Sequence, residues 1–248
     1  MRTGATAALI TGILSTVLAN PLLRSPSGVS AFGDEDAWVF SRIWYPAYCA
    51  TASNAVVCTS PPSYLTTNLV AENLIPAYND GSTQTGLCRY EYGVFRPNNI
   101  ASVGQDKLVQ YWPFAEATDL PRMWSGGFDG NTPEFNWTCG GLHQGAYLKK
   151  IVELTIDLGT PPLLSTSVGT DVDVAKLRTA LTASNGAPPV LVCDGANLVR
   201  VLTCYGKNNP DLHTTTDPTY DPQNAIACPS GWQQKDSCHE ATVHVASF

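Results

Sequence analysis

The sequence predicts an α+β fold, because strand-like and helix-like patterns occupy different parts of the chain. Strand patterns come early, helical spacing of apolar residues fills the middle, and a hairpin signal comes late. Of the 248 residues, 44% are hydrophobic, and neither a low-complexity linker nor an internal repeat divides them. We therefore expect a single domain over residues 35–248.

The N-terminus has the features of a secretory signal peptide. Arg2 supplies a positive charge, residues 5–18 are apolar and uncharged, and residues 17–19 fit the small-residue cleavage rule. The apolar stretch is shorter than the roughly 20 residues of a membrane span. We expect a signal at residues 1–19, with a second candidate end at residue 31, and a mobile leader over residues 20–34.

The first strand is expected at residues 38–44, which are rich in aromatic and β-branched side chains. Residues 64–70 are a second candidate strand, and residues 49–58 are expected to form a polar loop. Residues 190–193 and 198–205 flank an Asp-Gly turn and predict a hairpin. The alternating residues 241–248 predict a final strand.

Three helices are expected between the early strands and the late hairpin. Apolar residues near one face predict a helix at 102–112, and a broader apolar face predicts another at 144–158. A third is predicted at 170–184, where Thr170 and Asp173 resemble a capping box and an Asn-Gly pair follows.

Eight cysteines follow the predicted signal, and an even number in that context indicates disulfides. Zinc is the alternative. It is disfavoured because the chain has no C-x-x-C pair and its histidines do not cluster with cysteines. His239 and His244 are five positions apart, which does not place them on one helix face. We expect no metal and no other cofactor.

Four segments together resemble the T2 family of secreted endoribonucleases. They are the Trp-Tyr-Pro-Ala-Tyr-Cys run at 44–49, the Leu-Ile-Pro segment and Asn-Asp-Gly loop at 74–81, and residues 108–113 and 146–150. The resemblance implies a central antiparallel sheet with flanking helices. It also implies the pairs Cys49–Cys58, Cys88–Cys139, Cys193–Cys238 and Cys204–Cys228. With the predicted signal, it leads us to expect secretion or vacuolar delivery. We expect a monomer without membrane attachment, since no later segment is apolar and long enough to span a bilayer.

Members of that family cleave RNA by attack of the ribose 2′-hydroxyl on the adjacent phosphate, with two histidines transferring protons. In this sequence the first histidine position holds Glu72, and the position of a base-stacking tryptophan holds Ile75. In the second motif the Glu, Lys and His positions fall on Gly127, Gly130 and Asn136. No histidine precedes His143.

Loss of proton transfer at two centres lowers the rate by about 10²–10⁴-fold each. The sequence therefore predicts a catalytically degenerate family member that acts by binding, either of residual RNA or a nucleotide or of an extracellular protein. The alternative is an active or weakly active endoribonuclease that uses Glu72 as base and His143 as acid.

The charge of the chain does not favour RNA binding. The formal net charge is −7, whereas polyanion binding depends on clustered Lys and Arg. Ile75, Tyr111, Trp112 and Trp124 are candidate surfaces for bases, with a place in the core or cleft wall as the alternative. Asn136 begins an Asn-Trp-Thr sequon, and we hypothesise that a glycan there caps the vestigial cleft.

Overall fold

A computed structural model describes residues 35–52, 55–83, 96–115, 120–124, 133–208 and 220–248. The expected signal at 1–19, its alternative end at 31 and the leader at 20–34 lie outside these residues. So do Cys88, Gly127 and Gly130.

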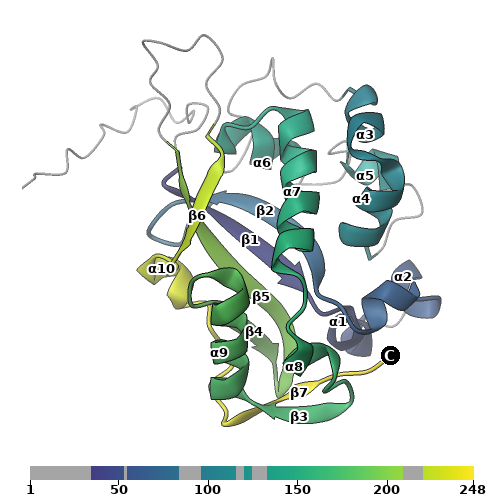
Figure 1. The fold of residues 1–248 in the computed structure, drawn as a ribbon, viewed down its shortest axis with the longest axis vertical. Helices are drawn as coiled ribbons and strands as arrows, with labels where there is room; N and C mark the ends of the chain where they lie inside the picture. Colours follow the sequence, from purple (N-terminus) through teal and green to yellow (C-terminus); the bar gives the residue numbers. More distant parts are fainter. Residues whose placement is uncertain (1–34, 53–54, 84–95, 116–119, 125–132, 209–219) are drawn as a thin grey trace, which may run out of the picture.

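The described residues form the expected α+β architecture, with one mixed sheet and helices packed against it (Figure 1). The strands run in the order β2-β1-β5-β7-β3, and β4 and β6 also pair with β5. All pairs are antiparallel except β5 with β7. The strands are β1 (Ala37–Ile43), β2 (Val70–Ala77), β3 (Thr170–Asp173), β4 (Val190–Asp194), β5 (Asn197–Lys207), β6 (Pro222–Ile226) and β7 (Thr242–Val245).

Strand β1 is buried along its whole length, as its aromatic and β-branched composition predicts. Trp38 and Phe40 pack on one face of the sheet with helix α7 (Gln144–Leu158), while Val39 packs in a separate cluster with Leu202. Gly140 ends helix α6 (Pro133–Gly140), and a Cβ there would lie 1.9 Å from the Trp38 ring. Only glycine therefore lets α6 approach the centre of the sheet so closely.

The expected helix at 144–158 coincides with α7, and the expected hairpin coincides with β4 and β5. The prediction for 170–184 is wrong at its start. Residues 170–173 form β3, which pairs with β7, and Asp173 is the N-cap of α9 (Val174–Asn185), accepting a hydrogen bond from the Lys176 amide at 2.8 Å. The strand ladder thus displaces the expected capping box by one turn.

Three other predictions need correction. The expected strand at 64–70 is a 3-10 turn, η1 (Ser63–Thr66), and pairing with β1 begins only at Val70. The expected polar loop at 49–58 is helical, with α1 (Tyr45–Thr51) and α2 (Val56–Thr59). The expected helix at 102–112 is divided at Gly104, whose φ of 98° breaks the helical path.

The division at Gly104 produces α3 (Asn98–Val103) and α4 (Gln105–Tyr111). The other helices of the described residues are short. They are α5 (Leu120–Trp124), α8 (Pro162–Ser165) and α10 (Ser230–Gln233). In the described part of the chain, no helix combines the length and apolar character that a bilayer crossing requires.

Three of the four expected disulfides are present: Cys49–Cys58, Cys193–Cys238 and Cys204–Cys228. The fourth, Cys88–Cys139, includes a residue outside the described ranges. Cys49–Cys58 ties α1 to α2, and the other two tie the C-terminal segment to β4 and β5.

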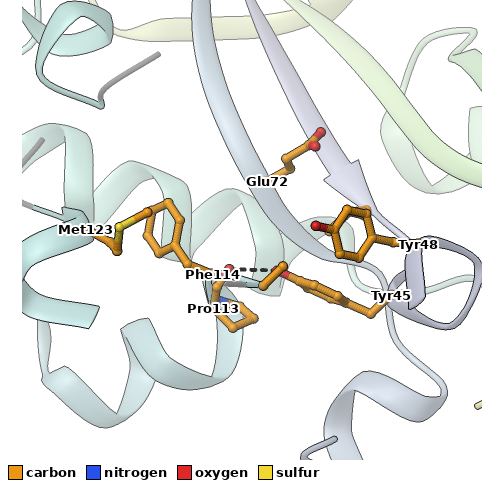
Figure 2. Close-up of a pocket in the computed structure, with 8 residues that line it drawn as sticks. Tyr45, Tyr48, Glu72, Pro113, Phe114 and Met123 are labelled. Atoms are coloured by element: carbon orange, nitrogen blue, oxygen red, sulfur yellow. Dashed lines mark hydrogen bonds between the residues drawn. The ribbon is translucent and has the colours of Figure 1, made fainter. Parts of the chain in front are cut away.

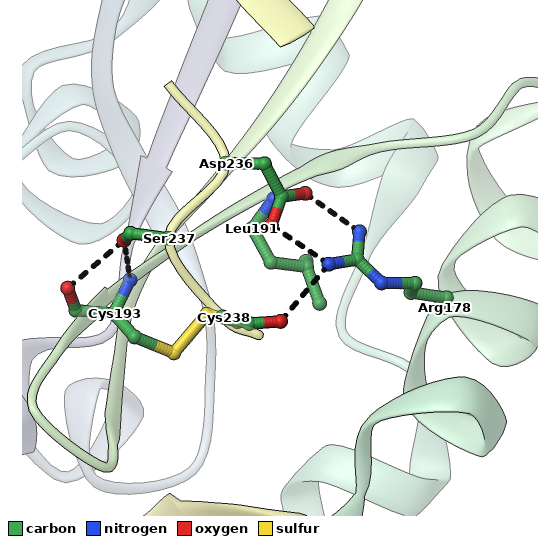
Figure 3. Close-up of a disulfide and its surroundings, with 6 residues drawn as sticks. All are labelled: Arg178, Leu191, Cys193, Asp236, Ser237 and Cys238. Carbon is green, nitrogen blue, oxygen red and sulfur yellow. Dashed lines mark hydrogen bonds and ion pairs between the residues drawn. A yellow bond between two sulfur atoms is a disulfide. The ribbon is translucent and has the colours of Figure 1, made fainter. Parts of the chain in front are cut away.

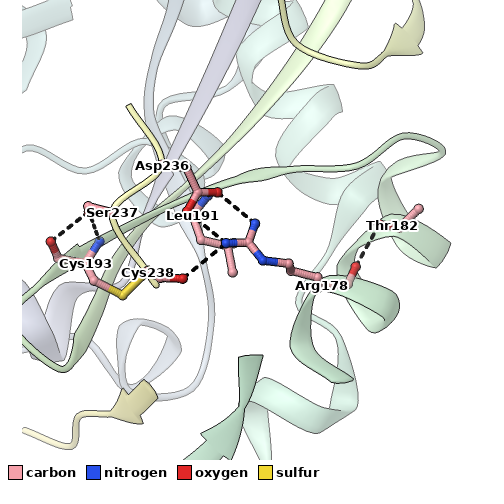
Figure 4. Close-up of polar contacts among 7 residues, drawn as sticks. All are labelled: Arg178, Thr182, Leu191, Cys193, Asp236, Ser237 and Cys238. Carbon is pink, nitrogen blue, oxygen red and sulfur yellow. Dashed lines mark hydrogen bonds and ion pairs between the residues drawn. A yellow bond between two sulfur atoms is a disulfide. The ribbon is translucent and has the colours of Figure 1, made fainter. Parts of the chain in front are cut away.

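The segment 236–238 covers the outer edge of β4 (Figure 3). Asp236 and Ser237 together satisfy the amide and carbonyl groups of Leu191 and Cys193. Asp236 also pairs with both terminal nitrogens of Arg178 on α9, at 2.7 and 2.8 Å (Figure 4). The Arg178 pair and the amides of Leu191 and Cys238 lower the pKa of Asp236, although burial opposes them as the largest single effect.

Arg42 of β1 is completely buried and joins the ends of two helices. Its guanidinium donates to the Gly159 carbonyl after α7 at 2.7 Å and to Asn185 Oδ1 at the end of α9 at 2.9 Å. Asn185 donates in turn to Thr203 on β5. Burial lowers the pKa of Arg42 to about 10, so these acceptors are needed to hold the charge in the core.

We expect Arg42→Lys to lower the free energy of unfolding by about 2–3 kcal/mol, because an ammonium cannot reach both acceptors in the geometry of the guanidinium fork. Urea denaturation followed by far-UV circular dichroism measures the change. Arg96→Lys, at an exposed position, is the matched control and should stay within about 0.5 kcal/mol of the parent protein. Equal losses in the two variants would contradict the role of Arg42.

Candidate functional site

Glu72, at the position that the resemblance assigns to the first catalytic histidine, is the extra residue of a β-bulge. On β1, Ser41 pairs with Asn73 and Arg42 pairs with Ala71, so Glu72 has no partner across the ladder. A bulge interrupts the regular alternation of side chains along its strand. Glu72 lies on the Ser41 face, away from α7, whereas Asn73 contacts residues of α6 and α7.

The Glu72 carboxylate binds two residues from neighbouring strands. Arg200 Nε on β5 lies 2.8 Å from each carboxylate oxygen, and Ser41 Oγ on β1 donates to Oε2 at 2.6 Å. The side chains of Glu72 and Arg200 are 31% and 35% exposed. The hydrogen bonds with Glu72 raise the pKa of Arg200, so the guanidinium keeps its charge and neutralises the carboxylate.

Asn136, at the position of the second catalytic histidine, joins a polar network on the other side of the bulge. Its Nδ2 donates to Asn73 Oδ1 at 2.6 Å, and the Tyr147 hydroxyl lies 2.9 Å from the same oxygen and 2.8 Å from the Leu74 carbonyl. Tyr147 is fully buried, and burial raises the pKa of its hydroxyl above the ordinary value. The network is uncharged.

Two of the candidate base-stacking residues are core residues. Trp112 and Trp124 are completely buried, and their indole N–H groups donate to the carbonyls of Glu72 and Trp112, at 2.9 and 3.2 Å, which offsets the cost of burying them. Neither ring presents a face to solvent in this conformation, so the alternative of a core role holds for both. The bond from Trp112 also satisfies the backbone carbonyl of Glu72, the residue that has no Cα partner in the ladder.

The remaining candidates are partly buried. Tyr111 lies edge-on to Tyr64, with ring centroids 5.3 Å apart. Ile75 on β2 packs against the cluster that contains Val39 and Leu202. His143 is the N-cap of α7, but its side chain makes no capping hydrogen bond to the helix.

Glu72 also borders a cavity of about 220 Å³ beside the first helices (Figure 2). Phe114 and Met123 lie on one side of it, Tyr45 and Tyr48 lie on the other, and Glu72 lies above them. The Tyr45 hydroxyl donates to the Pro113 carbonyl at 3.0 Å. Burial, with a smaller effect of the Glu72 charge, raises the pKa of Tyr45. None of His143, His239 and His244 is among the described residues that line this cavity.

Sequence reasoning missed Ser41 and Arg200 as partners of Glu72, and it missed the part that Tyr48 and Phe114 play in the cavity. Arg200 is 128 positions from Glu72, and nothing in its local pattern signals the contact. Tyr48 and Phe114 stand in or beside segments that carried the family resemblance. Among the described residues, no three His, Cys, Asp or Glu side chains gather in a geometry that would hold a metal ion.

No protein-family model matches the chain, and no curated protein matches it. Solved structures do. RNase NT, in complex with 5′-AMP, aligns at a TM-score of 0.62 and 19% identity over 87% of this chain and 100% of its own. Ribonuclease MC1 from bitter gourd seeds aligns at a TM-score of 0.60 and 18% identity, covering 84% and 99%.

The chain has the fold of the T2 ribonucleases. An RNase-related protein from Calystegia sepium shares this T2 fold at a TM-score of 0.54 and 16% identity, over 87% of this chain and 98% of its own. The architecture that the sequence resemblance implied is thus confirmed. Sequence identities below 20% show a shared fold alone. The chemistry of this chain therefore has to be inferred from its own residues.

The geometry around Asn136 argues against the glycan that the sequon predicts. The amide nitrogen that would carry the sugar already donates to Asn73, beside the buried Trp137. We expect Asn136 to be unmodified in secreted protein, as measured by mass spectrometry of the peptide that contains it. Thr138→Val, which removes the sequon, should leave the protein mass changed only by the substitution. A glycan-sized mass on Asn136 would refute this expectation.

We expect stability to fall steeply above about pH 10, in part because Tyr147 titrates at a higher pKa in the folded state than in the unfolded chain. Its contribution is complete below the unfolded pKa and is lost as the pH rises. Tyr147→Phe should therefore reduce the fall in unfolding free energy by about 1 kcal/mol per pH unit just above pH 10. Urea denaturation from pH 8 to 11 measures the slope.

Tyr147→Phe also removes hydrogen bonds, so a control must separate lost stability from lost titration. Ile151→Val removes a buried methyl group one turn along the same helix and should cost about 0.5–1.5 kcal/mol at every pH. Its slope above pH 10 should match that of the parent protein. The assignment to Tyr147 fails if both variants keep the parent slope.

Proposed function

We propose that this protein is a secreted relative of the T2 ribonucleases that does not cleave RNA and acts by binding an extracellular protein. One observation carries the first part. The Glu72 carboxylate, at the first catalytic position, is held by Arg200 and Ser41 in a neutral, hydrogen-bonded group. A base so engaged is poorly placed to remove a proton from a ribose hydroxyl.

The second proton-transfer position supports the same conclusion. An asparagine amide neither gives nor takes a proton near neutral pH, and Asn136 is committed to Asn73. Glu72 contacts Ser41 on one face of β2, and Asn73 contacts Asn136 near the other face. An in-line displacement needs its base and acid on opposite sides of one phosphate, and Asn136 is not among the described residues that line the cavity beside Glu72.

The alternative pair, Glu72 with His143, receives no support from the pocket geometry. His143 begins α7, where the next residue, Gln144, accepts hydrogen bonds from the Arg96 amide and from Asn99. Glu72 lines the cavity beside α1. A substrate phosphate would have to contact both residues, and His143 is not among the described residues that line that cavity.

A protein partner is favoured over RNA on electrostatic grounds. The chain carries 21 acidic residues against 14 basic ones. Arg200, the cation nearest to Glu72, is neutralised by it. Release of counterions by clustered Lys and Arg supplies most of the affinity for a polyanion, and such a cluster is lacking around Glu72 among the described residues. The signal-like N-terminus and the disulfides favour an extracellular site of action.

The test is incubation of the purified protein with RNA at pH 5 and pH 7, with detection of 2′,3′-cyclic phosphate ends. We expect no cleavage above that of a blank preparation. The preparation is compared with Glu72→Gln and with Glu240→Gln, an acid-to-amide control at an exposed position. Robust cleavage that disappears in Glu72→Gln and persists in Glu240→Gln would overturn the proposal and establish the enzyme.

RNA binding without cleavage is measured separately by gel shift at 50 mM and 200 mM salt. We expect no shift at either concentration. A shift that weakens strongly with salt would refute the choice of a protein partner and would assign a residual RNA-binding role instead.

A further inference from the structure

The cavity beside Glu72 has aromatic walls and a carboxylate at its surface. Its described walls include the rings of Tyr45, Tyr48 and Phe114 and the thioether of Met123. Glu72 is the one charged side chain among the described residues that line it. Binding sites for small molecules have this composition, with a mostly apolar surface and a few polar groups that select the ligand.

The arrangement of these side chains fixes what a ligand would contact. Figure 2 shows Phe114 and Met123 facing Tyr45 and Tyr48 across the cavity, with the Glu72 side chain extending from β2 at a third side. The Tyr45 hydroxyl is occupied by the Pro113 carbonyl, which holds that ring in place. A flat or aliphatic body fits between the two walls, and its polar end then lies toward the carboxylate.

The carboxylate can accept a further hydrogen bond while it keeps its present partners. A carboxylate offers about four lone-pair positions. Arg200 approaches through Nε alone, and Ser41 occupies one position on Oε2. Arg200 is not among the described residues that line the cavity, so a ligand meets the carboxylate before it meets the guanidinium.

We propose that this cavity binds a small organic cation, an amine with an aromatic or aliphatic body, between the Tyr48 and Phe114 walls and under the Glu72 carboxylate. The aromatic faces carry negative quadrupole potential and attract a cation. The Glu72 carboxylate oxygens face the same cavity, whereas their counter-ion Arg200 is not among the described residues that line it. A cation can therefore donate to the near carboxylate, and an anion such as a nucleotide phosphate is disfavoured by these oxygens and by the aromatic faces. The proposal goes beyond the protein-binding role given above, because it assigns a small-molecule ligand to the cavity beside Glu72.

The test uses three probes that share one body and differ in the charge of the head: 2-phenylethylammonium, 2-phenylethanol and phenylacetate. Isothermal titration calorimetry at pH 7 measures each, with 5′-AMP as a fourth probe. We expect the cation to bind about tenfold more tightly than the neutral alcohol, and phenylacetate and 5′-AMP to bind more weakly than the alcohol. Equal affinities, or preference for either anion, would overturn the proposal.

Two variants locate the selectivity. Glu72→Gln removes the charge at nearly constant shape and should abolish the preference for 2-phenylethylammonium over 2-phenylethanol, whereas Glu240→Gln should retain it. Phe114→Leu keeps the wall apolar but removes the aromatic ring. It should lower the affinity for 2-phenylethylammonium several-fold more than the affinity for 2-phenylethanol. Circular dichroism and the melting temperature confirm that each variant is folded. An unchanged preference in folded Glu72→Gln would refute the assignment.

The cleavage assay on the same preparation separates the two proposals. Selective amine binding together with RNA cleavage would overturn the proposed loss of activity and leave the ligand class standing. Absence of both cleavage and selective amine binding would overturn the ligand class and leave the loss of activity standing.

Discussion

One extra residue in β2 determines the geometry of the candidate site. Without the bulge, strict alternation would place Ala71 and Leu74, three positions apart, on opposite faces, whereas both belong to the cluster that packs with α7. With it, the carboxylate meets Ser41 and Arg200, and the amide meets Asn136 and Tyr147. The backbone carbonyl of Glu72 accepts a hydrogen bond from the indole N–H of Trp112. The charged Glu72–Arg200 pair and the uncharged Asn73 network thus begin at consecutive residues of β2.

Glu72 and Asn136, which occupy the positions of the expected histidines, each have partners that satisfy their charge or hydrogen-bonding groups. A lone carboxylate facing a partly buried surface would be costly without a counter-ion, and Arg200 supplies one from β5. The asparagines on the other side satisfy one another and the Tyr147 hydroxyl. Both centres are therefore well-made structural contacts, whereas catalytic groups are commonly held under electrostatic strain.

Much of the fold could be predicted from local patterns, and most of the site could not. The broad apolar face of α7 and the Asp-Gly turn between β4 and β5 are encoded within short windows, so both were found. Strand β3 was missed because its pairing with β7 joins residues about 70 positions apart. The same holds for Arg200, whose contact with Glu72 depends on strand order. Trp112 and Trp124 were ambiguous, because an indole suits a core and a binding face equally well.

The segment 236–238 along β4 has a consequence for association between molecules. An exposed strand offers its free amides and carbonyls to any other extended chain. Here Asp236 and Ser237 occupy those groups on Leu191 and Cys193, and the disulfide to Cys238 holds the segment in register. Reduction would remove this covalent link and leave the hydrogen bonds and the Asp236–Arg178 pair to hold the cover in place. The disulfide therefore helps to keep the edge of β4 closed to an extended segment of another molecule.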